Sequence, residues 1–150
     1  STQAKTLFPY TTLFRSDSRI ILSDMQGDGS RTTENRGAFA YSVFMEPSFS
    51  RVGLSEKEAA DKGLNYHVVR MNTDMIPKAK VLRKTTGMLK AVIDKDSGKI
   101  LGAALFCPES YEIINMVKLA MDHDLDYTVL RVFIYTHPTM SEGLNDLFAL

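Results

Sequence analysis

His137 differs from the chain's two other histidines because its neighbours could build a proton-transfer site around it. Pro138 restricts the backbone directly after it, and Thr139 or Ser141 could cap a helix that begins there. Glu142 would then lie in the first helical turn, within reach of the imidazole. A carboxylate that accepts the imidazole N–H favours the protonated ring, which suits a general acid–base group. A histidine and a glutamate that only cap a helix would show the same spacing, so both interpretations stay open.

The other histidines and an acidic cluster do not favour a metal site. His67 and His123 have neither another histidine nor a cysteine at ligand spacing. The carboxylates of Asp122, Asp124 and Asp126 alternate as in a calcium loop, but the glycine and the distant glutamate of such a loop are missing. We therefore expect a solvated acidic turn and no metal.

Cys107 is the only cysteine in the sequence, so neither an internal disulfide nor a two-thiol redox centre can form within one copy. It follows the apolar run 100–106, which favours a buried, unreactive thiol. Gly27 and Gly29 also carry no site. They lack the third glycine, the preceding strand and the following helix of a dinucleotide-binding loop, so we interpret them as a turn.

The composition is that of a globular domain without an electrostatic bias. Eighteen basic and eighteen acidic side chains cancel, so nothing indicates nucleic acid or an anionic membrane as a partner. No apolar stretch approaches the roughly 20 residues of a membrane span, and the N-terminus lacks the pattern of a signal peptide. We expect a cytoplasmic protein that binds neither nucleic acid nor membrane.

Two helices are indicated by capping chemistry and by apolar periodicity. Ser55 and Glu58 have the spacing of a capping box, and Gly63 stands where a left-handed residue would end that helix. A second helix is indicated by apolar side chains at helical spacing, namely Ile113, Met116, Val117, Ala120 and Met121. Shorter helices are expected at 17–25, 126–134 and 142–150.

The strand signals lie between and around these helices, at 39–45, 66–72, 88–93 and 99–106. The last two flank a polar turn that ends at Gly98, which is typical of an antiparallel hairpin. Gly102 inside the last strand predicts a close backbone approach. Residues 51–54 are expected only as the lead into the first helix, and 78–82 fit neither pattern. Together the elements predict an α+β fold, an antiparallel sheet with its helices on one face.

The first sixteen residues differ from the rest of the chain. Residues 6–16 show neither a helical nor a strand period, and they resemble, letter for letter, the in-frame translation of a common sequencing-library adapter. We expect 1–16 to be an artefactual leader outside the fold. An ordinary disordered tail is the alternative. By the first interpretation, the natural protein continues upstream of the junction.

Five short motifs occur in the order and spacing of one family, at 44–47, 52–56, 86–90, 100–102 and 137–142. With them the chain resembles the C-terminal dimerisation domain of the flavin-dependent pyridine nucleotide-disulfide oxidoreductases, the family of glutathione reductase, dihydrolipoamide dehydrogenase and mercuric reductase. Residues 112–118 and 144–148 look most like the mercuric-reductase-like branch implicated in defence against reactive chlorine and in copper(II) reduction.

The resemblance implies three regions and a dimer. Residues 1–16 would be the leader, 17–36 the remnant of the flavin domain with its linker, and 37–150 the dimerisation domain. The family forms homodimers, in which the C-terminal domain of one subunit completes the FAD site of the other. Electrons pass from NAD(P)H through FAD to a cysteine pair.

The resemblance also implies roles for the residues at the C-terminal motif. His137 would take and return a thiol proton, with Glu142 orienting it, and His137 and Pro138 would contact FAD in the partner subunit. No FAD or NAD(P)H fingerprint lies in this chain, so the chain alone is expected to bind neither cofactor and to be inactive. Mercuric reductases carry a C-terminal cysteine pair that is missing here, which counts against mercury(II) as a substrate.

Two other interpretations stay open. The chain could be a stand-alone dimerisation or interaction module whose His–Glu pair is only structural, or an unrelated small α+β binding protein. The sequence does not choose between NADH and NADPH, nor does it indicate the final electron acceptor.

Overall fold

The computed structural model describes the backbone of residues 4–149 and the side chains of residues 13–149. Its helices and strands follow in the order α1 Ala4–Met25, β1 Ala40–Val43, β2 Phe49–Gly53, α2 Glu56–Asp61, β3 Tyr66–Asn72, the 3-10 turn η1 Thr73–Met75, α3 Pro77–Leu82, β4 Met88–Asp94, β5 Ile100–Phe106, α4 Ser110–Asp122, α5 Thr128–Val132 and α6 Gly143–Leu147. None of the described helices is long and apolar enough to cross a membrane.

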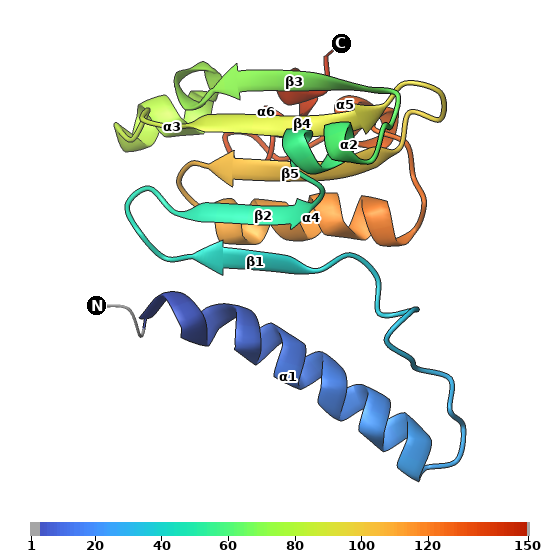
Figure 1. The fold of residues 1–150 in the computed structure, drawn as a ribbon. Helices are drawn as coiled ribbons and strands as arrows, with labels where there is room; N and C mark the ends of the chain where they lie inside the picture. Colours follow the sequence, from blue (N-terminus) through green and yellow to red (C-terminus); the bar gives the residue numbers. More distant parts are fainter. Residues whose placement is uncertain (1–3, 150) are drawn as a thin grey trace.

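The five strands form one antiparallel sheet in the order β1-β2-β5-β4-β3 (Figure 1). The predicted hairpin is confirmed as β4 and β5, and the strand predicted at 66–72 is β3. In the hairpin, Leu89 lies opposite Leu105 and Ala91 lies opposite Ala103, and all four side chains are buried in the core. The sheet therefore presents one apolar face for helices to cover.

The α+β fold class is confirmed. Helix α4 packs against β2 and β5, and α5 and α6 lie on the same side, behind the sheet in Figure 1. The core forms between these helices and the sheet, with Ile113, Ile114 and Val117 of α4 almost fully buried. The short α2 lies on the opposite side, in front of the sheet in the same view.

The prediction missed β2, because residues 51–54 were expected only to lead into a helix. The strand points Ser50 into the core, where its side chain is fully buried and lies 2.9 Å from the Ser110 hydroxyl. Ser48 is also buried and lies 2.8 Å from the same hydroxyl. Because buried hydroxyls satisfy one another here, a core-facing position carries a polar residue, and the alternation that marks a strand is lost.

Residues 6–16, whose sequence shows no helical period, have a helical backbone. The backbone of α1 is helical from Ala4 through Met25, so it joins that segment to the short helix expected at 17–25. The helix runs beside β1 (Figure 1) but covers little of the core, since Ile21, Leu22 and Met25 are each more than half exposed. Among the described side chains of this helix, at positions 13–25, only Ser23 is buried, so this part of the helix has no need of a clear apolar period.

The remaining differences concern where helices begin and end. The helix expected at 126–134 spans only Thr128–Val132, because Phe133 adopts an extended conformation. The one expected at 142–150 spans Gly143–Leu147, and position 150 lies outside the described residues. Residues 78–82, which fitted neither pattern, belong to α3.

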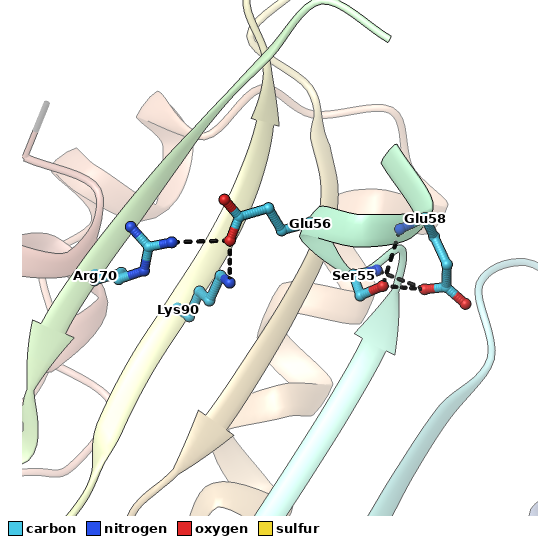
Figure 2. A network of polar contacts seen from close by, with 5 residues as sticks. All are labelled: Ser55, Glu56, Glu58, Arg70 and Lys90. Carbon is cyan, nitrogen blue, oxygen red and sulfur yellow. Dashed lines mark hydrogen bonds and ion pairs between the residues drawn. The ribbon is translucent and has the colours of Figure 1, made fainter. Parts of the chain in front are cut away.

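The predicted capping box at the start of α2 is confirmed (Figure 2). The Ser55 N–H and hydroxyl both donate to Glu58 Oε2 at 2.7 Å, and the Glu58 N–H donates to Ser55 Oγ at 3.1 Å. These bonds from Ser55 are the main reason that the pKa of Glu58 is lowered to about 2. Gly63 follows the helix with φ of +65°, as its position in the sequence predicted.

A second carboxylate ties α2 to the sheet. Glu56 accepts from Arg70 of β3 at 2.8 Å and from Lys90 of β4 (Figure 2). The two cations, Lys90 first, lower the pKa of this carboxyl. The ion pairs are partly exposed, so they orient α2 on the sheet and contribute little to stability.

The close approach predicted at Gly102 is confirmed. A Cβ atom on this residue would lie 2.1 Å from the Leu54 carbonyl oxygen. The Leu54 N–H donates to the neighbouring Leu101 carbonyl at 2.8 Å, so the backbone that enters α2 lies directly on β5. Only glycine leaves room for this contact.

Candidate active site

His137 and Glu142 are in direct contact in the segment that enters α6. The imidazole Nδ1 lies 2.8 Å from Glu142 Oε2, and the His137–Pro138 peptide bond is cis. Because an ionised carboxylate can only accept, the neutral ring must carry its proton on Nδ1 to make this bond. Nε2 is then left as the nitrogen that can accept a proton from another group.

The two side chains differ sharply in exposure. The His137 side chain is 69% exposed, whereas that of Glu142 is 15% exposed. The second oxygen of Glu142 accepts the Thr139 N–H at 3.2 Å, and Thr139 Oγ1 accepts the Glu142 N–H at 3.4 Å. The two bonds have the same reciprocal pattern as those between Ser55 and Glu58 at the start of α2. Glu142 is thus held in place by its own turn, independently of the imidazole.

Helix α6 fixes this turn to the core. Leu144, Leu147 and Phe148 are almost fully buried, as is Met140 just before the helix. At Gly143 an added Cβ would lie 2.7 Å from Ile76 Cδ1, so the helix begins in close contact with the core. The carboxylate of Glu142 therefore starts from a rigid element, which precise chemistry requires.

Exposed apolar side chains precede His137 in the sequence. We call them the apolar margin; they are Val129, Val132, Phe133 and Ile134, with exposed fractions of 37%, 66%, 51% and 93%. Phe133 also packs against the Tyr135 ring at a centroid distance of 4.9 Å. Apolar side chains exposed together in this way are typical of a surface that another molecule covers.

Asn145 is a residue near the pair that the sequence did not single out. Its side-chain amide, on α6, donates to three backbone carbonyls at the end of α5 and just beyond it. Those carbonyls lie 12 to 15 positions earlier in the chain, so no local spacing pattern indicates the contact.

The prediction of a buried, unreactive thiol agrees with the surroundings of Cys107. The side chain is fully buried, and its backbone N–H donates to the Ser48 carbonyl at 3.1 Å. Burial, and next the charge of Glu109, raises the pKa of the thiol to about 12. The reactive thiolate is therefore strongly disfavoured.

The structure does not bring the other predicted candidates to His137. His67 lies in β3, where its buried Nε2 has no hydrogen-bond partner among the described residues, and His123 follows the end of α4. In the acidic turn each carboxylate has its own partner: Asp122 accepts the Ala38 N–H, Asp124 the Lys99 ammonium and Asp126 the Thr128 N–H. Within the described part of the chain, no three His, Cys, Asp or Glu residues gather as a metal site would require.

Residues 39–148 match the family described as the dimerisation domain of pyridine nucleotide-disulphide oxidoreductases. The chain belongs to this family. The match includes the whole sheet, the helices behind it and the His137–Glu142 contact, so the predicted resemblance is confirmed for this part of the chain.

Curated relatives are enzymes of the same class. The chain is 45% identical over 141 residues to the probable pyridine nucleotide-disulfide oxidoreductase RclA of Escherichia coli K12, which is 94% of this chain and 32% of the relative. It is 36% identical over 103 residues to a mercuric reductase of Bacillus cereus, or 69% of this chain and 16% of that enzyme. The chain thus spans about a third or less of these relatives.

Solved structures agree with the sequence relatives. The HOCl-induced flavoprotein disulfide reductase RclA of Escherichia coli superposes with a TM-score of 0.86 at 47% identity, over 89% of this chain and 31% of that one. Its Cu(II) complex gives a TM-score of 0.85 at the same identity, over 89% of this chain and 30% of that one.

The comparisons do not test the predicted boundary between residues 16 and 17. The 141 matched residues of the RclA comparison leave nine of the 150 outside, so the match extends upstream of Asp17. The dimerisation-domain match begins only at position 39.

Proposed function

We propose that this chain is the dimerisation-domain part of an FAD-dependent NAD(P)H:disulfide, metal or oxidant oxidoreductase, and that it supplies His137 and Glu142 to the active site of a partner subunit. The observation that carries this proposal is the 2.8 Å contact between an exposed imidazole and a nearly buried carboxylate. An imidazole that only capped its own turn would gain nothing from so much exposure.

The pair is suited to moving one proton. A thiol of the partner subunit gives its proton to His137 Nε2, which leaves a thiolate and an imidazolium, and the return of that proton reverses the step. The Glu142 carboxylate, bound at Nδ1, stabilises the positive ring. Thr139 holds the other carboxylate oxygen, so the charge stays where the ring needs it.

The cofactors belong to the parent enzyme, and this chain alone is expected to bind neither. FAD, when bound in the parent, carries electrons from NAD(P)H to the cysteine pair. His137 and Pro138 would contact the FAD of the partner subunit. The exposure of His137 and of the apolar margin fits this role, because both leave an uncovered surface for the partner to meet.

The names of the relatives support this redox class. Escherichia coli RclA is an HOCl-induced flavoprotein disulfide reductase, and it has also been solved in complex with Cu(II). We propose that the parent of this chain works as a cytoplasmic homodimer with the same kind of redox chemistry.

A second candidate function is a stand-alone dimerisation module without catalysis. The reciprocal bonds between Glu142 and Thr139 favour it, because they would stabilise the turn whatever His137 does. The two functions differ in what happens when the imidazole is removed.

The test is a chimera in which residues 37–150 replace the matching C-terminal part of Escherichia coli RclA. His137→Gln should slow NAD(P)H-dependent disulfide reduction by roughly 10²–10⁴-fold, the range for lost general acid–base catalysis. Glu142→Gln should slow it less, since the imidazole remains. His123→Gln, directly after the end of α4, is the matched control and should keep the chimera's rate.

FAD content and melting temperature of each variant show whether it is folded. If His137→Gln binds FAD and turns over as fast as the His123→Gln control, the catalytic role is wrong and the stand-alone module is favoured.

A further inference from the structure

The side-chain amide of Asn145 connects α6 to the segment that leads to His137. Its Nδ2 lies 3.1 Å from the Leu130 carbonyl oxygen, 2.8 Å from that of Arg131 and 3.0 Å from that of Phe133. A carboxamide has only two N–H hydrogens, so at least one of them is shared between two carbonyls. One side chain thus binds three backbone groups at once.

These carbonyls need an outside donor. Helix α5 ends at Val132, and the last carbonyls of a helix have no partner within it. Asn145 supplies the donor from another helix. The Tyr135 hydroxyl adds a 3.2 Å bond to the Leu130 carbonyl, and burial raises the pKa of Tyr135 to about 12, so this hydroxyl keeps its proton at neutral pH.

The segment between α5 and His137 has two other anchors: Tyr135 packs against the core, and the Thr136 carbonyl accepts the Thr139 hydroxyl at 2.8 Å. Residues 133–136 have no regular secondary structure, and Phe133 and Ile134 are exposed. Helix α6, in contrast, is anchored by the fully buried Leu144 next to Asn145. Glu142 stands at the start of that same helix. The bonds of Asn145 therefore hold the segment before His137 against the helix that also carries Glu142.

We propose that Asn145 is a positioning residue, which holds the end of α5 and the following segment against α6 so that His137 Nδ1 reaches Glu142. Its meaning for catalysis rests on the function proposed above. The geometric claim does not, and it can be tested on the 150-residue chain alone.

The test reads the imidazole tautomers by nitrogen NMR at about pH 9, where histidine rings are neutral. The chain has three histidines, and His67→Gln and His123→Gln assign the signals. The wild-type His137 ring should carry its proton on Nδ1, because Nδ1–H donates to the Glu142 carboxylate. Asn145→Ala should shift its Nδ1–H to Nε2–H ratio toward Nε2–H by about tenfold, the effect of one lost hydrogen bond to a charged group.

Asn115→Ala is the matched control. Asn115 is an exposed asparagine on α4 whose Nδ2 also donates to a backbone carbonyl, that of Tyr111 at 3.0 Å. This variant should keep the wild-type tautomer of His137. If Asn145→Ala fails to fold, Asn145→Ser takes its place and should give the same shift, since the shorter side chain cannot bridge the three carbonyls.

A lowered melting temperature with an unchanged tautomer in Asn145→Ala, or in Asn145→Ser if that variant is used, would overturn the positioning role. Glu142→Ala gives the largest tautomer shift expected for His137, since it removes the hydrogen-bond acceptor itself. If Glu142→Ala shifts the tautomer and the Asn145 variant does not, only the inference about Asn145 fails. The chimera's rate decides the proposed function separately: a tautomer shift combined with unchanged turnover of His137→Gln would contradict the catalytic role alone.

Discussion

His137 and Glu142 form a pair in which one member is fixed and the other faces outward. Glu142 is bound twice, by the imidazole and by the Thr139 N–H, and it is nearly buried. The His137 side chain is largely exposed, and its Nε2 makes no part of the contact with Glu142. In the function proposed above, the proton is exchanged with a thiol of the partner subunit.

Cys107 cannot be that thiol, and its reactivity can be checked directly. In the native chain at pH 8 it should resist a thiol–disulfide exchange reagent, because a pKa of about 12 leaves a thiolate fraction about 10³-fold below that of an ordinary cysteine. In urea the same cysteine should react fully, which serves as the control. Rapid labelling of the folded chain would show that the thiol is neither buried nor disfavoured as a thiolate.

Residue-scale features could be predicted where they depend on near neighbours. The His137–Glu142 contact closes within five positions, and Pro138 and Thr139 lie between them, so the spacing indicated it. The bonds of Asn145 could not be predicted, because they depend on how α5 docks against α6. The buried Nε2 of His67 likewise became evident only once β3 was placed in the sheet.

At the scale of elements, the backbone contact between Gly102 and Leu54 fixes where α2 starts on the sheet. Gly102→Ala should destabilise the chain by about 3 kcal/mol or more, because the new Cβ would overlap the Leu54 carbonyl oxygen and force the backbone apart. Gly63→Ala is the control, since its Cβ would meet open space and only the positive φ would cost about 1–2 kcal/mol. Urea unfolding measures both; equal losses would mean that the close approach at Gly102 is not tight.

The elements that the sequence indicated are those with local signals. The capping box of α2, the polar turn of the β4–β5 hairpin and the apolar stripe of α4 each lie within one short stretch. Strand β2 was missed because Ser50 faces the core, where it is hydrogen-bonded to the hydroxyls of Ser110 and Ser42. Its buried partner Ser110 lies 60 positions away, so no local pattern explains the polar side chain.

At the scale of the whole molecule, the relatives of this chain are longer enzymes, of which it matches one part. It belongs to the dimerisation-domain family and spans 32% of Escherichia coli RclA. The imidazole of His137 and the apolar margin both remain largely exposed in the single chain. Both are accounted for if a second subunit covers them.

Subunit complementation tests most directly whether this domain lends its His–Glu pair to a partner. One version of the RclA chimera carries His137→Gln, and the other has the redox cysteines of its flavin domain changed to serine. The His137→Gln version alone should keep at most about 1% of the rate, and the serine version alone should be inactive. In a mixed dimer, the intact cysteines and the intact His137 lie on different subunits. One site of that dimer is therefore complete only if each site takes its histidine from the other subunit. An equal mixture, refolded together and confirmed as dimeric by light scattering, should therefore regain about a quarter of the parent chimera's disulfide reductase activity. An inactive mixture that nevertheless contains mixed dimers would contradict the account.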